Sequence, residues 1–154
     1  MFAGTRCGVI AQKTTAGYRY WRLAVTGFTS QFMSLAELQL IASDGVTQLA
    51  RNTSGATAVS NPVGNSGLRA DMLIDGDPTS ILVISGYPKS ATITVTTPNA
   101  ITPKYLRMQA RNPASEQTPT LFSLQASSDG STWATVLSPP LQDWSDGQVK
   151  TFTL

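Results

Sequence analysis

The stretch LFSLQASSDGSTWATVL, from Leu121 to Leu137, carries the clearest strand pattern in the chain. Apolar and polar residues alternate from Phe122 to Ala126, which is the period of a half-buried strand. The SDGS that follows, from Ser128 to Ser131, predicts a tight turn, because Asp can bond its own backbone and Gly adopts positive φ without strain. A second β-prone run then begins at Trp133. The stretch therefore predicts a β-hairpin with Trp133 in the hydrophobic core.

Similar patterns on both sides of this hairpin predict further strands. Tyr18–Thr26 places alternate apolar residues on one face, and Leu35–Ala42 fits either a helical stripe or a strand, with its neighbours favouring a strand. The remaining segments expected to form strands are 81–84, 91–96, 105–110 and 149–154, and 70–74 is expected to form a helical turn or a strand. The segments expected to form loops are 27–34, 51–69 and 111–120. Roughly eight short strands with little helix predict an all-β antiparallel sandwich or jelly roll.

Length and composition narrow the class of protein. The 154 residues suit one domain, which we place at 18–154, preceded by an N-terminal arm at 1–17. The single cysteine excludes an internal disulfide, and a net charge of +2 is too small to indicate nucleic-acid binding. No apolar run reaches the length of a membrane span, so membrane insertion is not expected.

The residue types argue against an enzyme. The chain contains no histidine, which removes the usual general base and the common catalytic triads. Cys7 has no partner base in its segment, and no glycine-rich phosphate loop occurs. Glu37 stands in an apolar stretch, where we expect it to bond backbone groups or an arginine such as Arg22 rather than to act as a catalytic acid. No catalytic residue is predicted.

Sugars are recognised by an aromatic face together with a few polar groups, and the predicted loops offer both. A core-filling role for each aromatic residue remains the alternative. The candidate ligand-binding residues are the aromatic Phe28, Phe32, Tyr87 and Trp144 and the polar Asn65, Arg69 and Arg111.

Three segments taken in order resemble discoidin domains, also called coagulation-factor type C domains. They are Tyr18–Leu23 with Ser34–Leu38, then Asp75-Gly76-Asp77 with Ser80, and then Phe122–Trp133. The resemblance covers nearly the whole chain and implies a galactose-binding-like jelly roll that binds ligands through loops at one end. The opening YRYWRL and the following SLAEL are most similar to versions in bacteriophage virion and tail proteins.

The resemblance also implies a cofactor, partners and a location. A structural calcium ion on Asp75, Asp77 and Ser80 is the one cofactor that it implies; a turn that bonds its own side chains is the alternative for these residues. The expected partners are other virion proteins, copies of the same chain and host-surface glycans. The expected location is the virion, assembled in the cytoplasm of the host bacterium.

Two functions from different classes follow. The first is a non-enzymatic virion protein of the tail, collar, baseplate or decoration type that aids carbohydrate or host-surface attachment. The second is a purely structural assembly subunit without a ligand, and a free carbohydrate-binding module is a further alternative. A binder should gather exposed aromatic residues at one loop end, whereas a scaffold subunit should bury them against neighbours.

Overall fold

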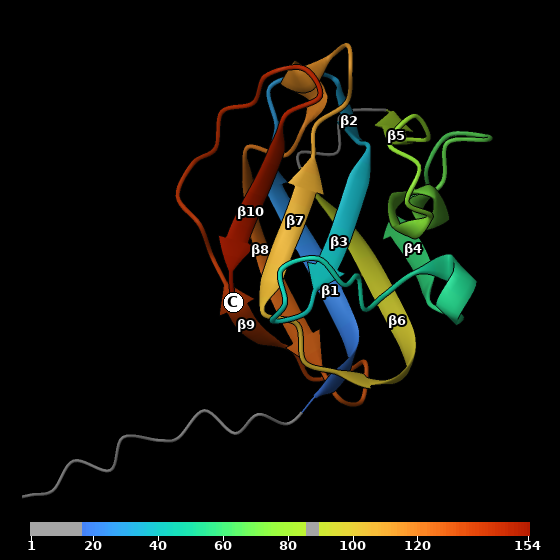
Figure 1. The fold of residues 1–154 in the computed structure, drawn as a ribbon. Helices are drawn as coiled ribbons and strands as arrows, with labels where there is room; N and C mark the ends of the chain where they lie inside the picture. Colours follow the sequence, from blue (N-terminus) through green and yellow to red (C-terminus); the bar gives the residue numbers. More distant parts are fainter. Residues whose placement is uncertain (1–16, 86–89) are drawn as a thin grey trace, which may run out of the picture.

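A computed structural model describes residues 17–85 and 90–154 (Figure 1). The predicted N-terminal arm, apart from Gly17, and the candidate Tyr87 lie outside these residues. The described chain is all-β, as predicted, with ten strands rather than roughly eight. The strands are β1 (Tyr18–Gly27), β2 (Phe32–Leu35), β3 (Glu37–Ile41), β4 (Thr57–Asn61), β5 (Leu82–Ser85), β6 (Ala91–Ile101), β7 (Tyr105–Gln109), β8 (Leu121–Ser127), β9 (Ala134–Leu137) and β10 (Val149–Thr153).

Helical structure in the described chain is limited to three short 3₁₀ segments. They are η1 (Asn52–Ser54), η2 (Ala70–Ile74) and η3 (Ser115–Gln117). The segment at 70–74 is thus a helical turn, the first of its two predicted forms. None of the described helices has the length and apolar character needed to cross a membrane.

The strands form three antiparallel sheets. The largest has the order β4-β6-β1-β8-β9, a second has the order β10-β7-β3, and β2 pairs with β5. In Figure 1 the sheet of β10, β7 and β3 lies in front of β8, β1 and β6. Inward side chains from all three sheets form one hydrophobic cluster.

The predicted alternation along β1 is confirmed. Trp21, Leu23 and Val25 are all buried, and they lie opposite β6 on one side and β8 on the other. Because side chains of successive residues point to opposite faces, β1 directs its other residues outward. The apolar face of β1 therefore forms the centre of the core.

The hairpin at 121–137 is confirmed as β8 and β9, with its turn as predicted. Asp129 Oδ1 accepts hydrogen bonds from the backbone N–H groups of Ser131 and Thr132, each at 2.8 Å, and Gly130 has φ of +75°. The prediction that Trp133 belongs to the core is wrong. Trp133 is half-buried and lies outside the core cluster, because it packs beneath Arg22, which points outward from β1.

Two predicted loops contain strands. β2 begins at Phe32, inside the expected loop 27–34, and β4 occupies Thr57–Asn61 of the expected loop 51–69. The expected strand at 35–42 is present, but its path breaks at Ala36 between β2 and β3, which belong to different sheets. β4 is an edge strand that pairs only with β6, and its half-buried side chains, Ala58 and Ser60, are too small to give an apolar alternation.

Candidate functional site

Connections that are distant in sequence meet at one end of the molecule, at the top of Figure 1. They are the link between β1 and β2, the segment around η3, and the segment that precedes β10. Thr29 Oγ1 donates a hydrogen bond to the Glu116 carbonyl at 2.7 Å, and the Gln142 N–H donates to the Thr120 carbonyl at 2.8 Å. These bonds hold the three segments together.

A groove with a volume of about 330 Å³ lies between the three segments. Its walls combine hydroxyl, amide, carboxylate and apolar side chains. The lining residues are Thr29, Ser115, Glu116, Thr120, Leu141, Gln142, Asp143 and Trp144. Such a mixture of apolar surface and a few polar groups is typical of small-ligand sites.

Trp144 lines the groove with a ring that is held in place from inside the protein. Its indole Nε1 donates a hydrogen bond to the Pro119 carbonyl at 2.8 Å, and its half-buried ring packs against the core cluster. Trp has both an apolar body and one polar group, and here the polar group is satisfied internally. The ring is therefore held in place before any ligand arrives.

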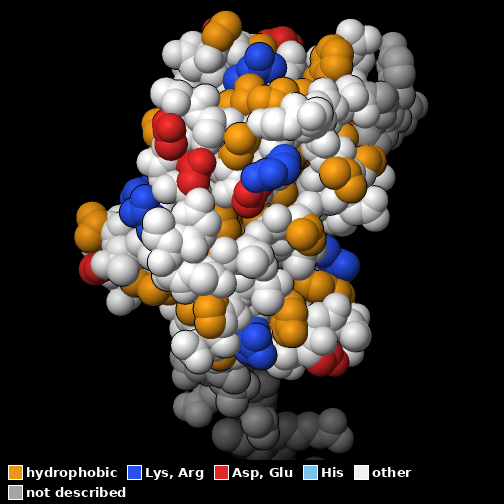
Figure 2. Space-filling model, turned by 90° about the vertical axis from the view of Figure 1, so that its right-hand side faces the viewer, with side chains coloured by type: hydrophobic (Ala, Val, Ile, Leu, Met, Phe, Trp, Pro, Cys, Tyr) orange, Lys and Arg blue, Asp and Glu red, His pale blue; other side chains and the backbone are white. Residues whose placement is uncertain are grey.

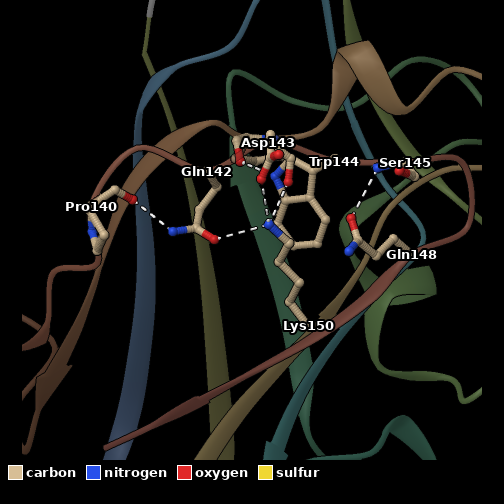
Figure 3. Close-up of polar contacts among 8 residues, drawn as sticks. Pro140, Gln142, Asp143, Trp144, Ser145, Gln148 and Lys150 are labelled. Atoms are coloured by element: carbon tan, nitrogen blue, oxygen red, sulfur yellow. Dashed lines mark hydrogen bonds and ion pairs between the residues drawn. The ribbon is translucent and has the colours of Figure 1, made fainter.

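Lys150 of β10 contacts three of the residues that line the groove (Figure 3). Its Nζ lies 4.8 Å from the centre of the Trp144 ring and donates hydrogen bonds to Gln142 Oε1 at 3.2 Å and Asp143 Oδ1 at 3.1 Å. The hydrogen bond from Lys150 lowers the pKa of Asp143, so this carboxylate is ionised at neutral pH. Asp143 itself is fully exposed and is available to a ligand.

The loop that carries these residues is held by further bonds from its own side chains. Gln142 Nε2 donates to the Pro140 carbonyl at 2.8 Å, and the Ser145 N–H donates to Gln148 Oε1 at 3.0 Å (Figure 3). Side-chain bonds of this kind reduce the number of conformations open to a loop. The groove wall is consequently preorganised.

The structure places six of the seven candidate binding residues, and they lie in several parts of the fold. Among these six described residues, only Trp144 lines this groove. Phe28 packs against the core cluster, and Arg111 donates to Gln117 Oε1 at 2.9 Å. Phe32 lies in β2, where the prediction of a loop position is wrong, and Tyr87 lies outside the described residues.

Asn65 and Arg69 lie elsewhere, between β4 and β5. Arg69 forms an exposed pair with Asp71, with Nη2 and Oδ2 2.8 Å apart. Asn65 Oδ1 accepts a hydrogen bond from Ser85 at 2.8 Å. Arg69 lines a separate groove of about 490 Å³ beside β4, which has no lining residue in common with the groove at Trp144.

The predicted calcium ligands lie together on the turn after η2, but their oxygens are bonded to neighbours. Asp75 accepts from the Asp77 N–H and from Ser80 Oγ, each at 2.7 Å. Asp77 Oδ1 accepts from Thr79 Oγ1 at 2.6 Å and from the Thr79 N–H at 2.9 Å. A cation would have to displace these bonds to gather the three ligands.

A positive charge already stands at this turn. Arg51 Nη2 donates to the Asp75 carbonyl at 3.1 Å, and the guanidinium lies directly over Gly76. Within the described residues no group of three acidic, histidine or cysteine side chains is arranged to hold a metal ion. Asp75, Asp77 and Ser80 are thus close together, but their oxygens are already bonded and Arg51 lies beside them, so the calcium site stays a prediction.

Comparison with known proteins adds no relative: no family model matches the chain, and no match was found among curated proteins or solved structures. The resemblance to discoidin domains consequently stays a prediction.

Sequence reasoning missed most of the groove. Thr29, Glu116 and Gln142 come from three separate connections, and no local pattern distinguishes them from other loop residues. One signal was available, since Pro139-Pro140 followed by an aromatic residue indicates a stiff segment with an anchor.

Proposed function

We propose that this protein is a non-catalytic carbohydrate-binding domain whose ligand site is the groove around Trp144. The observation that carries the proposal is the combination, in one preorganised groove, of Trp144 and Leu141 with Thr29, Glu116 and Asp143. Hydroxyl and carboxylate groups can bond sugar hydroxyls, while the apolar side chains can contact the ring carbons.

The balance of charge in the groove favours a ligand without strong negative charge. Glu116 and Asp143 both line it, and the positive charge of Lys150 is directed at Asp143 and Gln142. An acidic sugar would meet two carboxylates, whereas hydroxyl groups can donate to them. We therefore expect neutral or amino sugars to bind best.

The proposal includes the galactose-binding-like jelly roll. Its support is the arrangement of antiparallel sheets around one core, together with the ordered resemblance of three sequence segments. The absence of histidine from the sequence supports a binding role over a catalytic one.

We further propose that the domain is a subunit of a bacteriophage virion. The support is the resemblance of the opening strands to those of phage tail proteins, together with a low charged content of 13%. Many copies on one particle would strengthen attachment, because multivalency raises avidity without new contacts. Weak binding by a single groove would then suffice.

A glycan array tests the binding function. Fluorescent wild-type protein, presented as a multivalent conjugate, should bind a related group of neutral or amino glycans. Trp144→Ala should lose this binding, and Leu141→Ala should weaken it without changing the circular dichroism spectrum. Loss of signal in Trp144→Ala counts only if the variant remains folded by the same spectrum. Absence of any glycan bound by wild type would contradict the proposal.

A purely structural assembly subunit is the second candidate, and the side of the molecule at β4 favours it. Val59 and Val63 are 63% and 81% exposed and line the groove of about 490 Å³. Figure 2 shows this side, with hydrophobic side chains in separate patches among mostly uncharged polar groups. Val59→Asp should abolish assembly if copies associate through this side, and should leave glycan binding intact if the groove at Trp144 is the site.

A further inference from the structure

Glu37, the carboxyl residue that stands in an apolar stretch of the sequence, is not accessible to a ligand. It is only 3% exposed, and its carboxyl faces the Gly76 N–H and Arg51 inside the protein. The expectation that Glu37 bonds an arginine such as Arg22 is wrong for Arg22. Arg22 belongs to the other sheet, where its Nε donates to Gln125 Oε1 at 2.8 Å.

The groove around Trp144, in contrast, holds two carboxylates that a ligand can reach. Glu116 comes from η3, and Asp143 comes from the segment that precedes β10. Both side chains are exposed. Exposed carboxylates are ionised at neutral pH, so the groove presents two negative charges.

Asp143 is already paired within the protein. Lys150 Nζ donates to Asp143 Oδ1 at 3.1 Å and to Gln142 Oε1 at 3.2 Å (Figure 3). The Lys150 side chain is only 20% exposed, and its ammonium lies 4.8 Å from the centre of the Trp144 ring. A ligand ammonium beside Asp143 would therefore approach a fixed positive charge.

Glu116 has no such partner. Within the described residues its carboxylate forms neither an ion pair nor a hydrogen bond, and only its backbone carbonyl is bonded, by Thr29 Oγ1 at 2.7 Å. The cation nearest to it along the chain, Arg111, donates from Nη1 to Gln117 Oε1 at 2.9 Å and does not line the groove. Glu116 is thus the carboxylate that a positively charged ligand can bind.

The backbone that carries Glu116 is held from two sides. Thr29 Oγ1 bonds its carbonyl, and Asp146 Oδ1 accepts from the Ser115 N–H at 2.8 Å and from the Ala114 N–H at 3.2 Å. Asp146 has no ion-pair partner in the described part of the chain and adds negative charge beside the groove. Glu116 is therefore placed before a ligand binds, in surroundings that favour a cation.

Charge and shape together decide the chemical class of the ligand. Lys150 balances one of the two carboxylates, so one negative charge is left over in the groove, although the whole chain carries a net charge of +2. The groove also offers the hydroxyls of Thr29 and Thr120 and the apolar side chain of Leu141, which a simple cation would not use. Its volume of about 330 Å³ lies at the lower end of the range of small-ligand sites. A sugar ring with a free amino group uses all of these features.

We propose that the groove selects a hexosamine with an unsubstituted amino group, whose ammonium binds Glu116 and whose hydroxyls bond Thr29 and Thr120. The inference rests on the proposed carbohydrate-binding function and names its ligand class. N-Acetylation replaces the ammonium with a neutral amide. N-Acetylated and neutral sugars therefore bind in the same groove, but more weakly than the amino sugar.

Titrations followed by ¹H–¹⁵N correlation spectra at about pH 6 test this selectivity. The probes are the methyl glycosides of D-glucosamine and D-galactosamine, their N-acetyl forms, and the methyl glycosides of D-glucose and D-galactose. At low ionic strength at least one amino sugar should bind at the amides around Glu116 and Trp144 about two- to fivefold more tightly than its N-acetyl and neutral counterparts. Salt at about 1 M should reduce this ratio to about one. Equal affinities at low ionic strength would overturn the inference and leave the carbohydrate function standing, whereas no response to any sugar would contradict both.

Variants and a simple amine identify the group that selects the ligand. Glu116→Gln should reduce the ratio of the two affinities to about one, because it removes the charge and keeps the size of the side chain. Asp71→Asn removes one negative charge from the separate groove at β4, so it is the matched control and should keep the ratio. Propylamine should bind at least about threefold more weakly than the amino sugar, because it lacks the hydroxyls. A ratio that survives in Glu116→Gln or disappears in Asp71→Asn, or equal binding of propylamine, would overturn the proposal.

Discussion

The guanidinium of Arg22 lies over the ring of Trp133, 4.0 Å from its centre, on the outer face of the five-stranded sheet. Arg22 Nε also bonds Gln125 Oε1 at 2.8 Å, which holds the guanidinium in place. The contact joins β1 to the residue before β9 across β8. Trp133 thus covers the sheet from outside, whereas Trp21 fills the core from inside.

Trp133→Ala should therefore cost little stability. A cation–π contact contributes about 0.5–2 kcal/mol, and removing a half-buried ring opens no internal cavity. Trp21→Ala, at a side chain only 4% exposed, should cost about 3–5 kcal/mol. Urea unfolding measures both free energies. Equal losses for the two variants would show that Trp133 belongs to the core after all.

Gly76→Ala should destabilise the domain through Arg51. Gly76 has φ of +82°, and an added Cβ would overlap the Arg51 guanidinium. Gly45 is the matched control, because its φ is +77° and no atom lies within 4 Å of an added Cβ. Gly45→Ala should cost about 1–2 kcal/mol for backbone strain, and Gly76→Ala about 1–3 kcal/mol more for overpacking.

A double variant isolates the Arg51 contribution. In an Arg51→Ala background the additional cost of Gly76→Ala should disappear, since the overlapping group is gone. Thermal or urea unfolding of wild type, Gly76→Ala, Arg51→Ala and the double variant gives the four free energies that this comparison needs. If the additional cost persists, the clash lies elsewhere.

Glu37 should make the domain less stable as pH rises. Burial raises the pKa of Glu37 from 4.5 to about 7, with Asp75 adding to the rise and Gln39 and Arg51 opposing it. The folded state therefore holds this proton more tightly than the unfolded chain. Stability should fall between pH 4.5 and about 7 and level off above, by roughly 3 kcal/mol at most.

Glu37→Gln should flatten this slope and exceed wild type in stability at pH 8. Urea unfolding at intervals between pH 4 and pH 8 measures the effect. A wild-type slope that survives in Glu37→Gln would assign the pH dependence to another group.

Calcium should leave the melting temperature unchanged, because Thr79 and Ser80 already bond the carboxylates of the turn and Arg51 supplies a positive charge. If calcium did bind the folded protein, a free calcium concentration of a hundred times its Kd would raise the free energy of unfolding by about 2.7 kcal/mol. Scanning calorimetry with millimolar calcium and with chelator gives the comparison. A rise of several degrees in the melting temperature with calcium would contradict this prediction and would support a metal site at Asp75, Asp77 and Ser80.

The fold was predictable wherever one face of a strand is buried and the other exposed. β1, β6 and β8 all have this pattern, and they form the middle of the large sheet. β4 lacks this pattern in its sequence, because its half-buried side chains, Ala58 and Ser60, are small and its Val59 is exposed. The position of Trp133 was predicted wrongly because an aromatic ring can pack on either face of a sheet. Here it packs on the outer face, where Arg22 covers it.

The candidate site was much less predictable than the fold. Trp144 was recognisable as an aromatic residue in a loop, but the groove also needs Thr29 and Glu116 from other connections. Their proximity depends on tertiary hydrogen bonds such as that from Thr29 Oγ1 to the Glu116 carbonyl. The position of Glu37 opposite Gln109 likewise depends on the register between β3 and β7, which no local pattern specifies.

The most direct test of the account is calorimetric titration of the best glycan from the array into wild type, Trp144→Ala and Trp133→Ala. We predict that Trp144→Ala binds at least tenfold more weakly while remaining folded, and that Trp133→Ala binds as wild type does. Equal affinity of wild type and Trp144→Ala would contradict the assignment of the groove as the carbohydrate site.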